Sequence, residues 1–206
     1  MVANHAQKKI ARRIMADSEK PIGFTDAMAH VTKIDSLRRI RSLELPAESK
    51  AIVAEASRAL VAGSDLVIFG LAGSGRSTAA YSVLQAVQLR AFILTNHYLE
   101  AALLRNFLDI AGVYSSVQSQ HYFSGAIAAR SEVLMVDELR SSFADQGAQL
   151  STALPRILVI HGEDLDSARW RLERMMPELE LRSPVFLEAV YDRELRARGL
   201  RIHRAA

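Results

Sequence analysis

A glycine-rich turn, GLAGSGRST at positions 70–78, constrains the fold more than any other feature of the chain. Residues 65–69 before it are apolar and β-branched enough to form a buried strand, and residues 77–87 after it have a helical pattern. Glycines let consecutive backbone amides curl around an anion, and the amino end of a helix attracts negative charge. Strand, turn and helix therefore come in the order that a phosphate-binding loop requires.

The turn departs from the usual phosphate-loop pattern at one position. That pattern ends in a lysine that reaches the β- and γ-phosphates of a nucleotide, followed by a Ser or Thr whose hydroxyl binds Mg²⁺. Here Arg76 stands in the lysine position and Ser77 supplies the hydroxyl. Arginine can hold a phosphate through two hydrogen bonds, but its planar fork is broader than an ammonium group, so binding could survive while turnover falls. The plainer alternative is a glycine-rich turn that enters a helix capped by Ser77.

Apolar segments alternate with helical patterns after residue 45, which predicts an α/β fold with a mostly parallel sheet flanked by helices. Strands are expected at 65–69, 91–95, 133–138 and 156–160, and helices at 46–62, 77–87, 98–110, 123–129 and 164–175. Gly63 and Gly112 are expected to end the first and third of these helices. We predict two parts: a short helical N-terminal arm at 1–45 and a phosphate-loop domain at 46–206.

Composition limits the class of protein. The chain has 206 residues, half of them hydrophobic, which suits one buried core. It has no cysteine, so disulfides and zinc–thiolate sites are excluded, and no apolar run is long enough to cross a membrane. The net charge of +3 is mild. We therefore expect a cytoplasmic protein with no strong sign of nucleic-acid binding.

Two further groups of residues have ordinary explanations. Five arginines crowd the C-terminus and are expected to form a solvated tail or to contact an acidic partner rather than nucleic acid: Arg193, Arg196, Arg198, Arg201 and Arg204. Four aromatic residues fall at apolar helical spacings and are expected in the core: Tyr98, Tyr122, Phe123 and Trp170.

Two acids and one histidine follow predicted parallel strands. Asp137 and Glu138 end the segment 133–138, and His161 follows the segment 156–160. Ligands of parallel α/β sheets lie at the carboxyl ends of the strands, so His161 is expected at the same edge as Gly70 and Glu138. One acid could orient a magnesium shell and the next could polarise the attacking water, although acids also end many ordinary strands. His161 could sense a γ-phosphate or simply be satisfied at the start of the next helix.

With these landmarks in order, residues 43–175 resemble the C-terminal ATPase domain of the secretion and pilus-motor ATPases. That family powers type II and type IV secretion and type IV pili. The segments that carry the resemblance are the loop at 70–78, LMVDELR at 134–140, and His161 followed by ARWRL at 168–172. The resemblance implies a RecA-like P-loop NTPase fold that binds ATP and Mg²⁺.

The resemblance also implies a role for each site residue. Glu138 and His161 are implied to be catalytic, with Glu138 activating water and His161 sensing the γ-phosphate, and Ser77 is implied to bind the metal. The residues implied to bind the nucleotide are Gly70, Gly73, Ser74, Gly75, Arg76, Ser77, Thr78 and Asp137. The implied partners are further copies in a ring, or a related ATPase, on a secretion or pilus platform at the cytoplasmic face of the inner membrane.

Departures from the family pattern leave two interpretations. Arg76 replaces the loop lysine, Asp137 stands where the family has glycine, and TNHY at 95–98 replaces an acidic box, with only Glu100 nearby. Residues 1–45 are too few for the N-terminal domain of such motors. The chain is therefore predicted to be either an ATPase or a catalytically inactive structural or regulatory paralogue that keeps the fold.

Overall fold

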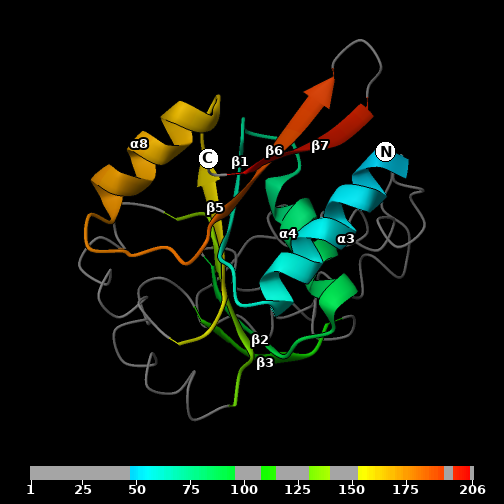
Figure 1. Ribbon diagram of the computed structural model, residues 1–206, viewed down its shortest axis with the longest axis vertical. Helices are drawn as coiled ribbons and strands as arrows, with labels where there is room; N and C mark the ends of the chain where they lie inside the picture. The colour runs from blue at the N-terminus through cyan, green and yellow to red at the C-terminus, as the bar shows by residue number, and fades with distance from the viewer. Residues whose placement is uncertain (1–46, 96–107, 115–129, 140–152, 193–196, 205–206) are drawn as a thin grey trace, which may run out of the picture.

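The computed structural model describes residues 47–95, 108–114, 130–139, 153–192 and 197–204 (Figure 1). These residues form one seven-stranded sheet in the order β3-β2-β4-β5-β1-β6-β7. The strands are β1 (Leu66–Gly70), β2 (Ala91–Thr95), β3 (Ile110–Tyr114), β4 (Val133–Asp137), β5 (Arg156–His161), β6 (Val185–Asp192) and β7 (Ala197–Arg204). Neighbouring strands are parallel except for the antiparallel pair β6 and β7. The predicted mostly parallel α/β sheet is confirmed.

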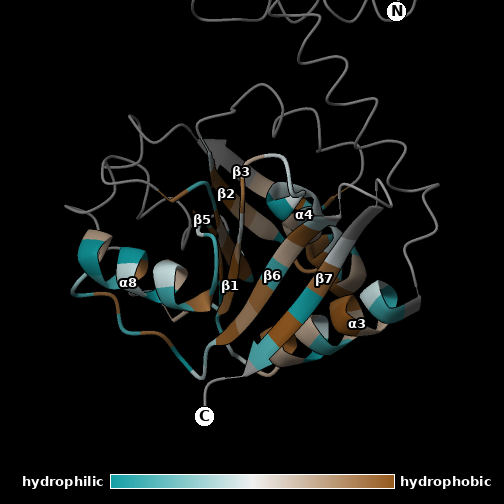
Figure 2. Ribbon diagram, turned by 90° about the horizontal axis from the view of Figure 1, so that it is seen from above, coloured by the Kyte–Doolittle hydropathy of each residue, from teal (hydrophilic) through white to brown (hydrophobic). Residues whose placement is uncertain are grey.

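Helices cover both faces of the sheet. Helices α3 (Ala47–Val61) and α4 (Arg76–Val87) lie on one face and α8 (Leu165–Met175) lies on the other (Figures 1 and 2). Each face of the sheet has its own hydrophobic core, and β1 contributes side chains to both. Leu66 and Ile68 pack toward α3 and α4, while Val67 and Phe69 pack toward α8. A strand buried on both faces has a continuous apolar sequence, which is why 65–69 could be recognised.

Local signals set the helix ends. Helix α3 ends before Gly63, whose φ of 94° is left-handed and whose N–H donates to the Leu60 carbonyl at 3.0 Å. Helix α8 begins after Asp164, whose carboxylate accepts the Ser167 N–H at 2.7 Å while the Asp164 N–H donates to Ser167 Oγ. Helix α4 begins at Arg76, one residue before the expected start.

One predicted helix end is wrong. Residues Ile110–Tyr114 form β3, which pairs in parallel with β2, so Gly112 lies within a strand and does not stop a helix. The outermost strand of a sheet needs few apolar residues. The segment IAGVY is also too short for the alternation of a strand to be distinguished from the end of a helical pattern. The predicted helix at 123–129, most of that at 98–110 and the arm at 1–45 lie outside the described residues.

Two expectations for the C-terminal third are also wrong. Arg198, Arg201 and Arg204 belong to β7, so this segment is a strand and not a tail, although the Arg201 side chain is 67% exposed; Arg193 and Arg196 lie outside the described residues. Trp170 is not in the core: it is 57% exposed on α8, and the Arg174 guanidinium lies 5.2 Å from its ring centroid. Tyr98, Tyr122 and Phe123 lie outside the described residues.

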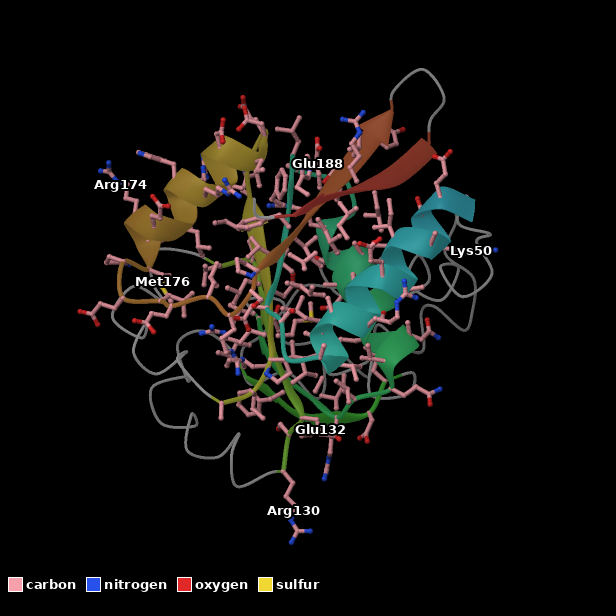
Figure 3. All side chains as sticks on the ribbon, in the orientation of Figure 1. Lys50, Arg130, Glu132, Arg174, Met176 and Glu188 are labelled. Carbon is pink, nitrogen blue, oxygen red and sulfur yellow. The ribbon has the colours of Figure 1, made fainter. Side chains whose placement is uncertain are left out.

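The parallel strands give the sheet two distinct edges. We call the edge where β1 and β5 end, at Gly70 and His161, the carboxyl edge, and the opposite one the amino edge. In Figure 3, Glu188 of β6 lies near the carboxyl edge, and Glu132, just before β4, lies at the amino edge.

Candidate functional site

The loop at 70–78 forms a tight turn between the end of β1 and the start of α4. Gly75 is the N-cap of α4 with a left-handed φ of 99°, and no side chain caps the helix, so the interpretation of Ser77 as a capping residue is wrong. Gly70 has a φ of 151°, and a Cβ there would lie 2.4 Å from the Ala189 carbonyl oxygen and 2.6 Å from Ser74 Oγ. The turn therefore needs glycine both for backbone conformation and for the close approach of β6.

Two buried donors of the loop have no hydrogen-bond partner among the described residues. Ser74 is 3% exposed and its Oγ is unpaired, and one guanidinium nitrogen of Arg76, Nη1, is also buried and unpaired. Buried polar atoms are nearly always satisfied, and exceptions call for an explanation such as an absent ion or ligand. Both donors belong to the loop at the amino end of α4, where the helix dipole favours an anion. The arrangement suits a phosphate group.

Asp137, the last residue of β4, is tied to α4 through both carboxylate oxygens. Ser77 Oγ donates to Oδ1 at 2.8 Å, and Tyr81 Oη donates to Oδ2 at 3.1 Å. Asp137 is 2% exposed and Tyr81 is 6% exposed, so both hydrogen bonds lie in a poorly hydrated environment. Thr78, also assigned to the site, follows in the first turn of α4 and is half-buried. These contacts join the glycine loop to the acidic end of β4.

Glu138 directly follows β4 in a left-handed backbone conformation, with a φ of 64°. Such a conformation is uncommon for a residue with a long side chain and is often found at functional sites. Glu138 acts electrostatically on Arg76. Burial, and to a smaller extent the charge of Arg171, lower the pKa of the Arg76 guanidinium, whereas the carboxylates of Glu138 and Asp137 raise it. The net shift is downward, yet an arginine stays protonated in proteins. The two acids and Arg76 therefore belong to one charged cluster.

His161 ends β5 beside the loop. It pairs in register with Gly70 of β1, and the Gly162 N–H donates to the Gly70 carbonyl at 3.3 Å. Its Nδ1 is buried without a partner among the described residues. The structure therefore places His161 at the same edge as Gly70 and Glu138, as expected, with a ring nitrogen available for hydrogen bonding.

Comparisons with known proteins bear on the fold. No protein-family model matches the chain, and no curated protein matches it in sequence. Among solved structures it is similar to the VirB11 ATPase from the Brucella suis type IV secretion system in complex with sulphate, with 13% identity and a TM-score of 0.58 over 97% of this chain and 61% of that one. The chain shares the fold of the VirB11 ATPase. The resemblance predicted from the motifs is thus confirmed at the level of the fold.

A second solved structure similar to this chain is the Legionella pneumophila ATPase DotB, with 17% identity and a TM-score of 0.45 over 79% of this chain and 48% of that one. The chain covers 61% of the length of the VirB11 structure. The activity and assembly of a whole secretion ATPase are therefore carried to this chain only as proposals.

The residues at the site fit a resident Mg²⁺ poorly. The resemblance implies Ser77 as the ligand, but Ser77 is hydrogen-bonded to Asp137, whose second oxygen accepts the Tyr81 hydroxyl. At the end of β2, beside Asp137, the fully buried Thr95 stands where the resemblance would place an acid. Among the described residues no group of three or more His, Asp or Glu side chains could hold a metal. Within this secretion-ATPase fold the site matches phosphate better than a metal.

Two residues at the site were given no role by the sequence analysis. Tyr81 lies four positions after Ser77, one helical turn along the same face of α4, and this spacing could have indicated that both hydroxyls reach the same acid. Arg171 of α8 acts electrostatically on Arg76, so it adds a second positive charge. The position of α8 relative to Arg76 depends on the sheet order, in which β5 lies beside β1, and no local pattern gives that order.

Proposed function

We propose that this chain binds ATP through the loop at 70–78. The observation that carries the proposal is the pair of buried, unpaired donors, Ser74 Oγ and Arg76 Nη1, at the amino end of α4. A triphosphate would satisfy both donors, and charge-assisted hydrogen bonds from a guanidinium to phosphate are strong and geometrically specific. The secretion-ATPase fold supports the same conclusion, because it places the acids and His161 at the edge where such a ligand would lie.

The proposed roles follow from position. The loop amides, with Ser74, Arg76, Ser77 and Thr78, hold the phosphates, and Asp137 holds Ser77 in place. Glu138 activates water for attack on the γ-phosphate, and His161 senses that phosphate. Mg²⁺ at Ser77 stays a prediction of the resemblance; when bound, the ion would neutralise phosphate charge. In this form the protein is an ATPase of the type that drives type II or type IV secretion or pilus assembly.

The second candidate is an inactive paralogue that binds nucleotide without hydrolysing it. The observation that favours it is the charged cluster, in which Arg76 replaces the loop lysine and acts on both Asp137 and Glu138. Loss of one preorganised donor commonly costs about 2.7 to 4 kcal/mol of transition-state stabilisation. In this form the nucleotide would control how the chain contacts its partners.

The assembly and the location are also proposed from the resemblance. We expect a homo-oligomeric ring, or co-assembly with a related ATPase, on a membrane platform at the cytoplasmic face of the inner membrane. None of the helices in the described part of the chain is both long and apolar enough to span a bilayer.

Calorimetric titration with Mg²⁺–ATP, beside a phosphate-release assay on the same protein, tests the proposal. Saturable binding is expected, and binding with turnover would identify an ATPase, whereas binding without turnover would identify the inactive paralogue. Glu138→Gln should abolish any turnover and retain binding. Glu132→Gln, the same change at the amino edge (Figure 3), should alter neither. No binding by the wild-type protein would contradict the proposed function.

A further inference from the structure

The carboxylate that would organise a metal's water shell is already occupied by protein donors. Asp137 accepts the Ser77 hydroxyl at one oxygen and the Tyr81 hydroxyl at the other, with distances of 2.8 and 3.1 Å. All donor and acceptor atoms of this arrangement come from β4 and α4. A magnesium shell would have to share Asp137 with both hydroxyls, because Mg²⁺ requires near-ideal octahedral geometry and retains several waters.

Positive charge is already built into the same cluster. Arg76 lies within the electrostatic reach of Asp137 and Glu138, and Arg171 of α8 lies within reach of Arg76. Arg76 therefore offsets part of the charge of the two carboxylates, while its buried Nη1 keeps an unused hydrogen-bond donor for an anion. Mg²⁺ is attracted to sites with uncompensated negative charge, whereas this cluster gives a metal little electrostatic advantage.

The unpaired donors nevertheless require an anion. Ser74 is 3% exposed, and its Oγ has no hydrogen-bond partner among the described residues. Arg76 Nη1 is likewise buried and unpaired. Both can donate to phosphate oxygens, and the guanidinium of Arg76 cannot bind a cation because it has no acceptor atom. The polar groups of the loop that lack partners are thus complementary to phosphate itself.

We propose that this site binds the polyphosphate of a nucleotide without a divalent metal ion, with Arg76 supplying the positive charge and Tyr81 keeping Asp137 satisfied. The inference rests on the proposed function, since it concerns the same ligand. Arg76 is then the residue that makes the metal dispensable. Arginine suits this role better than lysine, because its fork reaches two phosphate oxygens at once and is weakly hydrated.

Isothermal titration of the protein with ATP, once in excess EDTA and once in excess Mg²⁺, tests the inference. We expect the dissociation constants for ATP in EDTA and in Mg²⁺ to agree within about threefold. Arg76→Lys should weaken binding in EDTA by about tenfold or more, and added Mg²⁺ should restore much of the loss. Tyr81→Phe should make ATP affinity rise with Mg²⁺, because it frees one oxygen of Asp137.

Tyr191→Phe is the matched control for the tyrosine change. Tyr191 lies on β6, is 44% exposed and lines a pocket with Gly70 and Ser74, so its variant tests whether loss of a tyrosine hydroxyl near the loop, other than the one bonded to Asp137, changes the dependence on Mg²⁺; we expect no such change. Wild-type binding that requires Mg²⁺ would overturn the inference and leave the proposed function intact. Unchanged binding of the Arg76→Lys variant in EDTA would also overturn it. No binding under either condition would contradict both proposals.

Discussion

The two edges of the sheet use charged residues in opposite ways. At the amino edge, Asp65, Arg156 and Arg182 form a cluster that we call the clip. Asp65 is fully buried, and its Oδ1 accepts the backbone N–H and Nε of Arg156, each at 3.0 Å. Its Oδ2 accepts Arg156 Nη2 at 2.5 Å and the Arg182 backbone N–H at 2.8 Å. The carboxylate is thus fully hydrogen-bonded by two other segments of the chain.

At the carboxyl edge the polar groups are incompletely satisfied. Ser74 Oγ, Arg76 Nη1 and His161 Nδ1 are buried without partners among the described residues, and Glu138 has a left-handed backbone. In the clip, Arg182 Nε is also buried without a partner among the described residues, but the side chain is 38% exposed and both of its terminal nitrogens, Nη1 and Nη2, are hydrogen-bonded. The comparison indicates that the amino edge holds the sheet together, while the carboxyl edge keeps groups available for a ligand.

Removal of the central acid of the clip is the strongest test of this comparison. Asp65→Asn should lower the free energy of unfolding by about 3 to 5 kcal/mol, because it leaves the buried Arg156 guanidinium without its counter-charge. Urea unfolding followed by circular dichroism measures the change. Nucleotide binding, measured under conditions where the variant is folded, should be nearly unchanged, since the site lies at the other edge.

Asp109→Asn is the matched control for Asp65→Asn. Asp109 pairs with Arg90 at 3.8 Å, but both side chains are largely exposed, at 63% and 45%. Exposed ion pairs contribute about 0 to 1 kcal/mol, so the same chemical change should have a small effect there. An equal loss in both variants would show that the clip is no more important than a surface ion pair.

Acid should weaken the clip through protonation of Asp65. Burial raises the pKa of Asp65, but the hydrogen bonds from Arg156 and Arg182 and the charge of Arg156 outweigh it, so that pKa lies below its ordinary value. The unfolded chain, with an Asp pKa of about 3.9, then binds protons first as the pH falls. The stability from Asp65 is therefore fully present above about pH 4 and is lost as the pH falls through the folded-state pKa.

Unfolding in urea between pH 6 and pH 3 measures this dependence. The difference in stability between the wild-type protein and Asp65→Asn should shrink as the pH falls below about 4, because protonation removes the charge that the substitution removes. If Asp65→Asn does not fold, Arg182→Ala, which leaves the Arg156 contacts in place, serves instead. A difference that stays constant across this range would show that the charge of Asp65 does not stabilise the fold.

Much of the fold could be predicted because its central strands are continuous apolar runs. Strands β1, β2, β4 and β5 are each buried on both faces, and their sequences are bounded by turn residues. Strands β6 and β7 could not be found in this way, since Glu188 and Arg201 face a partly open side of the sheet. Their signal was alternation: Leu200 and Ile202 pack toward α3 and α4, while Arg201 and His203 lie beside Glu188.

The candidate site was predictable in its parts but not in its pairings. The loop, Asp137, Glu138 and His161 each have a local sequence signal at a strand end. The hydrogen bond between Tyr81 and Asp137 joins residues 56 positions apart, and the hydrogen bonds of the clip join residues 91 and 117 positions apart. Such pairings depend on which strands are neighbours, and the order β4-β5-β1-β6 cannot be read from any single segment.

The smallest expected effect concerns backbone strain at the carboxyl edge. Glu138 has a φ of 64°, and asparagine tolerates this region better than glutamate, so Glu138→Asn should stabilise the protein by up to about 1 kcal/mol while abolishing any turnover. Gln88, the C-cap of α4, has a similar φ of 54° and lies outside the site, so Gln88→Asn should give a similar gain with ATP binding unchanged. Thermal unfolding with and without ATP measures both. Destabilisation by Glu138→Asn alongside stabilisation by Gln88→Asn would mean that the contacts of Glu138 outweigh its strain, and that this residue also supports the fold.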